Sequence, residues 1–86
     1  MIKIWADRAW EDYLYWQEVD KKTLKRVNAL LKDIERNGYH GLGHPEPLKY
    51  ERQDFWSRRI DATHRLIYRI VDEHLEIVQC RAHYDD

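Results

Sequence analysis

The sequence predicts an α+β fold, in which two N-terminal helices pack on one face of a single antiparallel β-sheet. Three patterns support this prediction. Apolar and polar residues alternate over Ile2–Trp5, a helical period runs from residue 21 to residue 36, and alternation returns over residues 55–70 and 75–81. With 86 residues the chain has room for one small core, so we expect a single domain spanning residues 1–86.

The strand at residues 2–5 is expected to lead directly into a first helix. Asp7 is predicted to cap the N-terminus of this helix, because a short carboxylate can accept hydrogen bonds from the free amides of the first turn. Four residues then recur at helical spacing: Trp10, Tyr13, Leu14 and Gln17. The aromatic residues among them are expected to pack the helix onto its neighbours.

A second helix is predicted from Lys21 to Arg36, with Asp20 as its N-cap and Asn37-Gly38 as its end. At roughly 100° per residue, one arc of this helix is apolar and the opposite arc is basic. The apolar arc holds Leu24, Val27, Leu30, Leu31 and Ile34, and the basic arc holds Lys21, Lys25, Lys32 and Arg36. A charged outer face is usually only solvated, but a polyanion that also touched basic residues elsewhere could be held here.

The segment after the second helix is predicted to be a loop, because Gly41, Gly43 and two prolines exclude a helix. His40 and His44 lie four residues apart in this loop. We do not expect them to bind a metal ion, since no helix aligns them and no cysteine cluster lies nearby.

Glu46 and Lys49 stand at the entry to the sheet, on either side of Pro47 and Leu48. The proline fixes the local backbone, so a carboxylate and an ammonium group would be held in set directions. They are therefore candidate reactive groups. The alternative is an ordinary exposed ion pair.

Residues 55–70 are predicted to form two strands joined by a short polar turn, with apolar residues alternating with arginine on both arms. The arginines are Arg58, Arg59, Arg65 and Arg69. They indicate a surface that meets phosphate or carboxylate, and the alternative is a solvated face paired with local acids. The residues expected to form the scaffold of this hairpin are Trp56, Ile60, Leu66, Tyr68 and Ile70.

A last strand is predicted from Leu75 to Arg81, and its single cysteine, Cys80, is expected to be a buried thiol. A lone cysteine fits a reducing cytoplasm. No apolar run reaches the length of a membrane helix, and the first residues lack the pattern of a signal peptide, so we expect a cytoplasmic protein without a membrane partner.

The charge balance of 15 basic and 16 acidic side chains argues against a nonspecific polycationic nucleic-acid binder. The charges are unevenly distributed, however. Residues 1–20 carry two basic and five acidic groups, and residues 21–43 carry six basic and two acidic groups. The positive charge is therefore concentrated in one segment of the chain.

A short set of residues could carry chemistry: Glu46, Lys49, Arg59, Arg65, His83 and Tyr84, with His64 in the turn as a further histidine. A carboxylate, a histidine and several cations suffice to cleave RNA without a metal ion. The 2′-hydroxyl must lose a proton, the phosphate gains charge, and the departing 5′-oxygen needs a proton. The same residue types occur in many small domains, and no Ser-His-Asp order, Gly-rich phosphate loop or paired-carboxylate motif accompanies them.

Several blocks of the sequence together closely resemble YoeB/Txe toxins of the RelE/ParE superfamily. The blocks are MIKIW at residues 1–5, AWEDYLYWQ at 9–17, PEPLK at 45–49, FWSRRI at 55–60, HRLIY at 64–68 and the closing His83-Tyr84. The resemblance spans nearly the whole chain. It implies the RelE-like microbial RNase fold and the toxin of a bacterial type II toxin–antitoxin pair, which cleaves mRNA in the ribosomal A site without a cofactor or metal ion.

The same resemblance implies roles for individual residues. Glu46 would be the general base and His83 the general acid, and Arg65 would contact the scissile phosphate. Lys49 and Arg59 would be further cationic contacts with the substrate, and Tyr84 would orient it. The implied partners are a YefM/Axe-like antitoxin, the ribosome with its A-site mRNA, and a second copy of the chain in a homodimer.

One departure from the family pattern lies after the His-Tyr pair, where Asp85 and Asp86 follow. Two anions beside His83 would favour its protonated form and would also repel RNA. Two other function classes remain open from the sequence. One is a non-enzymatic inhibitor of translation or gyrase on the same fold, and the other is a plain binding module whose basic residues serve only the antitoxin.

Overall fold

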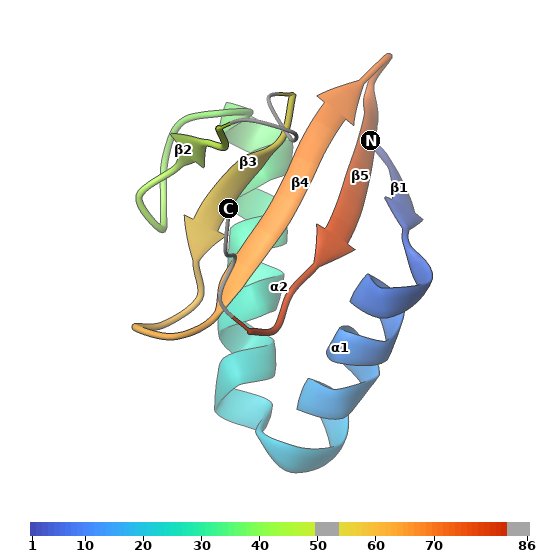
Figure 1. Ribbon diagram of the computed structural model, residues 1–86, viewed down its shortest axis with the longest axis vertical. Helices are drawn as coiled ribbons and strands as arrows, with labels where there is room; N and C mark the ends of the chain where they lie inside the picture. The colour runs from blue at the N-terminus through green and yellow to red at the C-terminus, as the bar shows by residue number, and fades with distance from the viewer. Residues whose placement is uncertain (50–53, 83–86) are drawn as a thin grey trace.

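Two helices cover one face of a five-stranded sheet in the computed structural model of the chain, which describes residues 1–49 and 54–82 (Figure 1). The elements in chain order are β1 (Ile2–Trp5), α1 (Asp7–Val19), α2 (Lys21–Asn37), β2 (Glu46–Pro47), β3 (Trp56–Arg59), β4 (Arg65–Val71) and β5 (His74–Gln79). The predicted α+β class and the order of its elements are confirmed, and the last strand ends at Gln79, two residues before its predicted end.

The strands lie in the order β1-β5-β4-β3-β2, so the first and last strands of the chain are neighbours. All pairs are antiparallel except one, because β1 runs parallel to β5. The parallel pair is possible because α1 and α2 lie between β1 and the rest of the sheet in the chain and provide the long connection that parallel strands need. The sheet is therefore antiparallel with one parallel edge strand.

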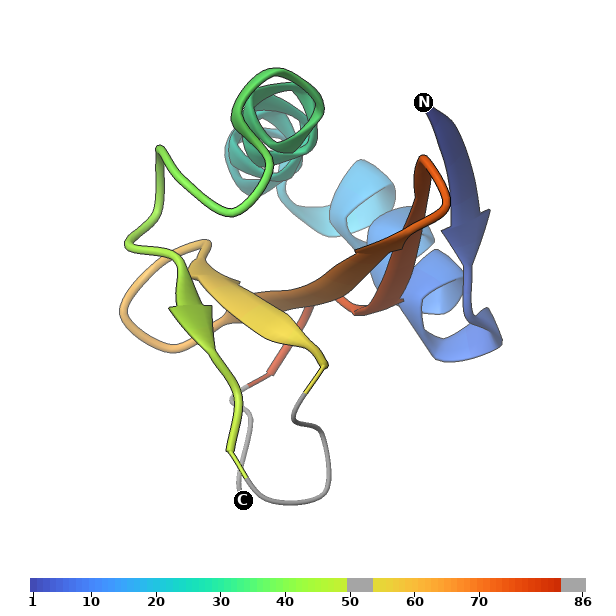
Figure 2. The same ribbon diagram turned by 90° about the horizontal axis from the view of Figure 1, so that it is seen from above.

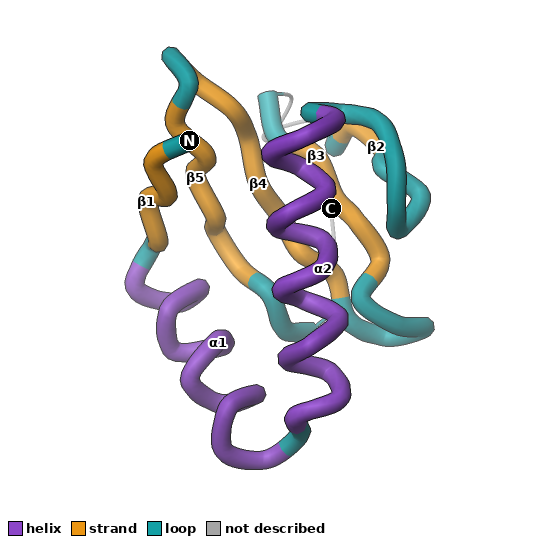
Figure 3. The backbone as a smooth tube through the Cα atoms, turned by 180° about the vertical axis from the view of Figure 1, so that it is seen from behind, coloured by secondary structure: helices purple, strands orange, loops and turns teal. Residues whose placement is uncertain are grey.

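Both helices lie on the same side of the sheet, as the views from above and from behind show (Figures 2 and 3). The core between the layers includes Val27, Leu30 and Ile34 of α2, packed with Leu66, Tyr68, Leu75 and Ile77 of the sheet. The apolar arc predicted for the second helix is thus confirmed. Its basic arc is exposed to solvent at all four predicted positions.

The two predicted helix caps have different outcomes. Asp20 is the N-cap of α2, where its carboxylate accepts hydrogen bonds from the Thr23 amide at 3.1 Å and the Thr23 hydroxyl at 2.7 Å. The prediction for Asp7 is wrong, because the helix already begins at Asp7. Ala6 occupies the N-cap position and makes no side-chain hydrogen bond there. Asp7 lies instead in the first turn of α1, where its charge favours the helix dipole.

The expected packing of α1 is confirmed in part. Tyr13 packs against the core, and its hydroxyl donates to Asn28 of α2 at 2.8 Å. Trp10 and Leu14 are exposed, however, and the buried residues of the helix are Ala9, Asp12 and Trp16. Asp12 is buried because its carboxylate accepts a hydrogen bond from the Cys80 amide at 3.0 Å, just after β5 ends. A period drawn through apolar residues alone misses this face, because one of its central positions is a carboxylate.

Within the described parts of the chain, no helix is long and apolar enough to cross a membrane.

Candidate functional site

Glu46, Arg59 and Arg65 lie on the face of the sheet that the helices leave uncovered. In the antiparallel register Glu46 is opposite Ser57, and Arg59 is opposite Arg65. Residues directly opposite each other project to the same face with Cβ atoms about 5 Å apart, and Ser57 and Arg59 share that face because they are two residues apart. The three predicted groups therefore come from three adjacent strands and share one surface.

The loop between α2 and β2 reaches the sheet through Gly43. Its carbonyl accepts a hydrogen bond of 2.7 Å from the Arg59 amide, and its φ of 80° lies in the left-handed region. A Cβ atom at this position would stand 2.9 Å from a methyl of Leu30 and 3.1 Å from the Arg59 carbonyl. Only glycine therefore allows the loop to approach so closely and to place Glu46 beside β3.

Arg58 points to the opposite face from Arg59 and is fully buried. Its guanidinium donates to the carbonyls of Gly38 and His40, both at 2.8 Å, and to that of Leu42 at 3.0 Å. It also forms an ion pair with Asp33 of α2. The expectation of four surface arginines in this hairpin is therefore wrong for Arg58, which ties the loop before Glu46 to the second helix.

Asp33 completes this arrangement from the α2 side. Its carboxylate accepts hydrogen bonds from the Leu42 amide at 2.9 Å and the Asn37 amide group at 2.8 Å. The bond from Arg58, followed by that from Leu42, holds the pKa of Asp33 below its usual value, although burial acts in the opposite direction. Asp33 is thus ionised when it meets the guanidinium, and the buried charge of Arg58 is compensated.

Glu46 is exposed to solvent, and one of its carboxylate oxygens is already engaged. His44 Nε2 lies 2.7 Å from Glu46 Oε1, which leaves Oε2 accessible. From the sequence, His44 was considered only as a metal ligand. No strand period predicts this contact, because His44 has a φ of 53° and lies outside the extended backbone of β2.

Arg65 is half-buried, and its side chain contacts the turn between β3 and β4. Its Nη1 donates to the carbonyl of Asp61 at 2.8 Å and to that of His64 at 3.1 Å. Asp61 caps the same turn by accepting from the amides of Thr63 and His64 at 2.8 and 2.6 Å. Partial burial acts to raise the pKa of the Asp61 carboxyl, but these amides keep it below its usual value.

A further guanidinium group reaches the end of β3 from the helix layer. Arg26 of α2 donates to the Arg59 carbonyl at 3.1 Å, so its cationic group lies where β3 ends. Arg26 does not belong to the basic arc predicted for the second helix, and its position beside β3 was not expected. Its contact depends on the packing of α2 against β3, which no local pattern reveals.

Of the remaining predicted site residues, Lys49 belongs to the described part of the chain and the two C-terminal ones do not. Lys49 is exposed after β2, in the short stretch where the Leu48 amide donates to the Phe55 carbonyl at 2.8 Å. His83 and Tyr84 lie outside the described residues, as do Asp85 and Asp86. The described chain ends at Ala82, whose carbonyl accepts a hydrogen bond of 3.1 Å from the Arg65 amide. The segment that continues to His83 therefore starts beside Arg65.

Arg69, the last of the four hairpin arginines, is paired within the sheet. Its guanidinium forms an ion pair with Glu76 across β4 and β5, and it lies over the ring of Phe55 with its carbon 4.8 Å from the ring centroid. This arginine fits the alternative reading of a sheet face paired with local acids. The arginines of the hairpin therefore divide into one buried, one paired and two at the candidate site.

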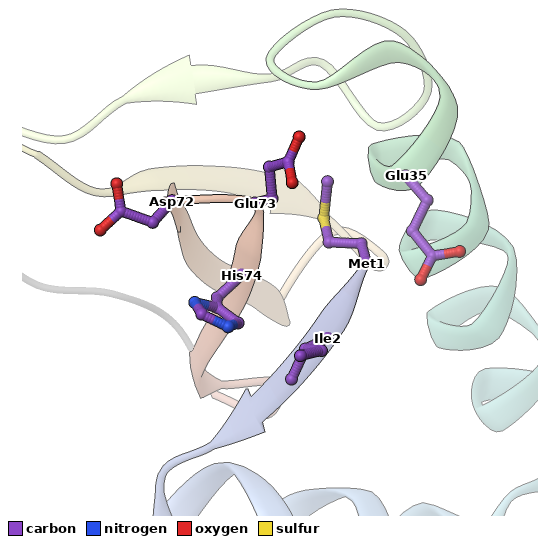
Figure 4. A pocket seen from close by; sticks show the side chains of 6 residues that line it. All are labelled: Met1, Ile2, Glu35, Asp72, Glu73 and His74. Carbon is purple, nitrogen blue, oxygen red and sulfur yellow. The ribbon is translucent and has the colours of Figure 1, made fainter.

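A pocket of about 590 Å³ lies at the other end of the sheet. It is lined by Met1, Ile2, Glu35, Asp72, Glu73 and His74. Its three carboxylates point in different directions around the opening (Figure 4). Among residues 1–49 and 54–82, no three acidic, histidine or cysteine side chains are grouped closely enough to hold a metal ion.

The surface around Glu46, Arg59 and Arg65 combines an exposed carboxylate with guanidinium groups on a rigid sheet. A carboxylate with one accessible oxygen can accept a proton from a bound hydroxyl, and guanidinium groups stabilise negative charge on phosphate oxygens. This combination suits chemistry on a phosphodiester.

Comparisons with known proteins agree with this fold. The family model described as the YoeB-like toxin of bacterial type II toxin-antitoxin system matches residues 5–84. Toxin YoeB of Escherichia coli strain K12 is 52% identical over 84 residues, which cover 98% of this chain and 100% of the relative.

Solved structures of a Staphylococcus aureus protein have the same fold. A chain of its YoeB-YefM complex superimposes with a TM-score of 0.92 at 44% identity, with 98% of each chain covered. A chain of its YoeB dimer gives a TM-score of 0.92 at 45% identity, again with 98% of each chain covered.

Proposed function

Since this chain belongs to the family of YoeB-like toxins of bacterial type II toxin–antitoxin systems, we propose that it is a ribosome-dependent endoribonuclease that cleaves mRNA in the ribosomal A site and thereby stops translation. The observation that carries this proposal is the shared surface of Glu46, Arg59 and Arg65 on three adjacent strands. A non-enzymatic inhibitor would have no evident need for an exposed carboxylate among these cations.

In the proposed mechanism the reaction begins at a 2′-hydroxyl of the mRNA. Glu46 Oε2 takes the proton while His44 holds the other carboxylate oxygen. The 2′-oxygen attacks the adjacent phosphorus, and Arg65 and Arg59 stabilise the charge that gathers on the phosphate oxygens. His83 gives a proton to the departing 5′-oxygen. The products are a 2′,3′-cyclic phosphate and a 5′-hydroxyl end, because no water takes part.

Lys49 and Tyr84 have supporting roles in this proposal. The Lys49 ammonium group would contact a neighbouring phosphate, and the Tyr84 ring would stack on a base of the mRNA, as aromatic side chains do with single-stranded RNA. The exposed basic arc of α2 would face ribosomal RNA.

The proposed partners follow from the same charges and from the family. Staphylococcus aureus YoeB forms a complex with YefM and a dimer, and we expect this chain to bind a YefM/Axe-like antitoxin and to form a homodimer. The antitoxin segment that covers the site should be acidic, because guanidinium groups that hold phosphate also hold carboxylate. Its place of action would be the cytoplasm, where ribosomes translate.

The test uses ribosomes programmed with a defined mRNA, on which new 5′ ends are mapped with and without the protein. Glu46→Gln should lower the cleavage rate by about 10²-fold or more, since general-base catalysis contributes that much. Glu18→Gln is the matched control, because Glu18 is exposed on α1 away from the site and should cleave as fast as the unchanged protein.

A second arm replaces the nucleotide at the cleavage site with its 2′-deoxy form. Cleavage at that position should stop, because the attacking hydroxyl is gone. Continued cleavage there, or products with 5′-phosphate ends, would show that water attacks the phosphate and that the proposed mechanism is wrong.

A further inference from the structure

The chain makes a sharp turn at Ala82, the last described residue. Its φ of 77° lies in the left-handed region, which residues with a Cβ atom rarely adopt. Two hydrogen bonds hold it there. The Ala82 amide donates to Nδ1 of His64 at 2.7 Å, and its carbonyl accepts from the Arg65 amide at 3.1 Å. His64, just before β4, and Arg65, its first residue, therefore hold one strained residue from both sides.

The imidazole of His64 is itself firmly placed. Its ring packs edge-on against the buried indole of Trp16, with 4.9 Å between the ring centroids. Its backbone amide donates to Asp61 Oδ1 at 2.6 Å, and its carbonyl accepts from the Ile60 amide at 3.0 Å. The ring thus connects α1, the turn after β3 and the segment after β5.

The hydrogen bond from Ala82 determines the chemical state of this ring. An amide can donate only to a ring nitrogen with a lone pair, so His64 is neutral here with its proton on Nε2. In this state Nδ1 acts as an acceptor and takes no part in proton transfer to substrate. Its contact is with the backbone one residue before the candidate general acid, His83.

We infer that His64 is a positioning residue of the ribonuclease site, and this inference rests on the proposed function. By accepting the Ala82 amide, its Nδ1 fixes the starting point of the segment that carries His83 and Tyr84 beside Arg65. The strained turn at Ala82 depends on this acceptor. Because His83 follows Ala82 directly in the chain, loss of this acceptor would shift the backbone from which the acid projects, and misplacement of a reacting group by about 1 Å can cost on the order of 10²-fold in rate.

Two substitutions of His64 separate the contribution of its hydrogen-bond acceptor from that of its aromatic ring. His64→Asn keeps an acceptor, since the side-chain oxygen of asparagine can take the place of Nδ1, but it removes the aromatic ring. His64→Phe keeps a ring against Trp16 but has no acceptor. We expect His64→Phe to lose on the order of 10²-fold in cleavage rate at saturating ribosome concentration, and His64→Asn to stay within about 10-fold of the unchanged protein.

A merely structural role of the His64 ring would give the opposite order of cleavage rates for the two variants. If the ring contact with Trp16 were what mattered, His64→Asn would be the more damaged variant, and equal rates for the two variants would likewise overturn the inference. Binding of each variant to the ribosome is measured alongside, and it should not change, because the contacts of Arg59 and Lys49 are untouched.

The hydrogen bond can also be observed in the unchanged protein without any activity measurement. In the ¹⁵N-labelled chain, an N–H···N hydrogen bond gives a through-bond coupling between the Ala82 amide nitrogen and His64 Nδ1. We expect this coupling, and its absence would overturn the inference even if neither variant folded. If the unchanged protein shows the coupling but cleaves no mRNA, the proposed function fails. If it cleaves mRNA and His64→Phe cleaves equally well, only the role of His64 fails.

Discussion

Neighbouring arginines on β3 have opposite roles, because successive residues of a strand face opposite sides of the sheet. Arg59 is exposed on the helix-free face beside Arg65, whereas Arg58 is buried under the helices. Arg58 uses its guanidinium to satisfy three loop carbonyls, the Tyr68 hydroxyl at 3.1 Å and the Asp33 carboxylate. Among single residues, Arg58 therefore does most to hold the loop that precedes the candidate base.

Removing the charge of Asp33 should leave Arg58 buried without compensation. We expect Asp33→Asn to lower the free energy of unfolding by about 3 kcal/mol at neutral pH, as is usual when one partner of a buried pair is removed. Asp72→Asn is the control, because Asp72 is exposed at the β4–β5 turn and its substitution should change stability by less than about 0.5 kcal/mol. Urea unfolding measures both values.

The same pair predicts how stability depends on pH. In the folded chain the Arg58 guanidinium holds the pKa of Asp33 below its usual value, so the unfolded state binds more protons in acid. Its contribution is complete above the unfolded pKa and is lost as the pH falls through the lower folded pKa. Asp33→Asn should therefore lose less stability between neutral pH and about pH 3 than the unchanged protein, and an equal loss in both would contradict this assignment.

At the scale of elements, the loop between α2 and β2 decides where the candidate base stands. Four of its residues have positive φ, namely Gly38, Gly41, Gly43 and His44. The loop crosses from the helix layer to the sheet edge and must pass close to Leu30 and Arg59. A strand of only two residues, β2, then carries Glu46, so the loop and not the strand positions it.

Two glycines of this loop give a matched pair of substitutions. Gly43→Ala combines a positive φ with contacts of 2.9 and 3.1 Å, so we expect it to displace β2 and to reduce mRNA cleavage by about 10-fold or more. Gly38→Ala has a φ of 65° but meets nothing within 4 Å. It should lose about 1–3 kcal/mol of stability from backbone strain alone and keep its activity. Equal activities for the two variants would show that the approach of Gly43 does not position Glu46.

The sequence predicted the elements well where a single physical pattern dominates. The second helix has a carboxylate cap at Asp20 and a continuous apolar arc that includes Ile34. Both features were predicted correctly. For the first helix, the packing of Tyr13 was expected but the burial of Asp12 was not, because its carboxylate accepts a hydrogen bond from the Cys80 amide near the far end of the chain. No local period contains that information.

The candidate site shows the same limit. The placement of Arg59 and Arg65 on one surface follows from strand alternation and was expected. The burial of Arg58 depends on a loop that folds back over it, and the contact of His64 with Ala82 joins residues distant in sequence. Contacts of this kind come from the assembled fold, so sequence patterns alone did not reveal them.

At the scale of the whole molecule, Cys80 reports on the integrity of the fold. It connects the end of β5 to α1, since its carbonyl accepts from the Trp16 indole at 2.8 Å and its amide donates to Asp12. Burial, and then the nearby charge of Asp12, raise the pKa of its thiol to about 12. The reactive thiolate is therefore scarce in the folded chain.

Thiol labelling should consequently follow unfolding of the whole domain. We expect a disulfide reagent such as DTNB to label Cys80 quickly in denaturant and only slowly in the native protein. Asp33→Asn should accelerate native labelling, because it lowers stability at a site far from the cysteine in sequence. Rapid labelling of the native protein, unchanged by Asp33→Asn, would mean that the segment around Cys80 opens locally.

The parallel pairing of β1 with β5 has a consequence for synthesis of the chain. β5 lies between β1 and β4, so the strand made first has no partner in the sheet until residues 74–79 have been made. Such long-range pairing makes late stages of folding depend on the whole chain. The sheet of the nascent chain therefore stays incomplete until its last strand has left the ribosome that makes it.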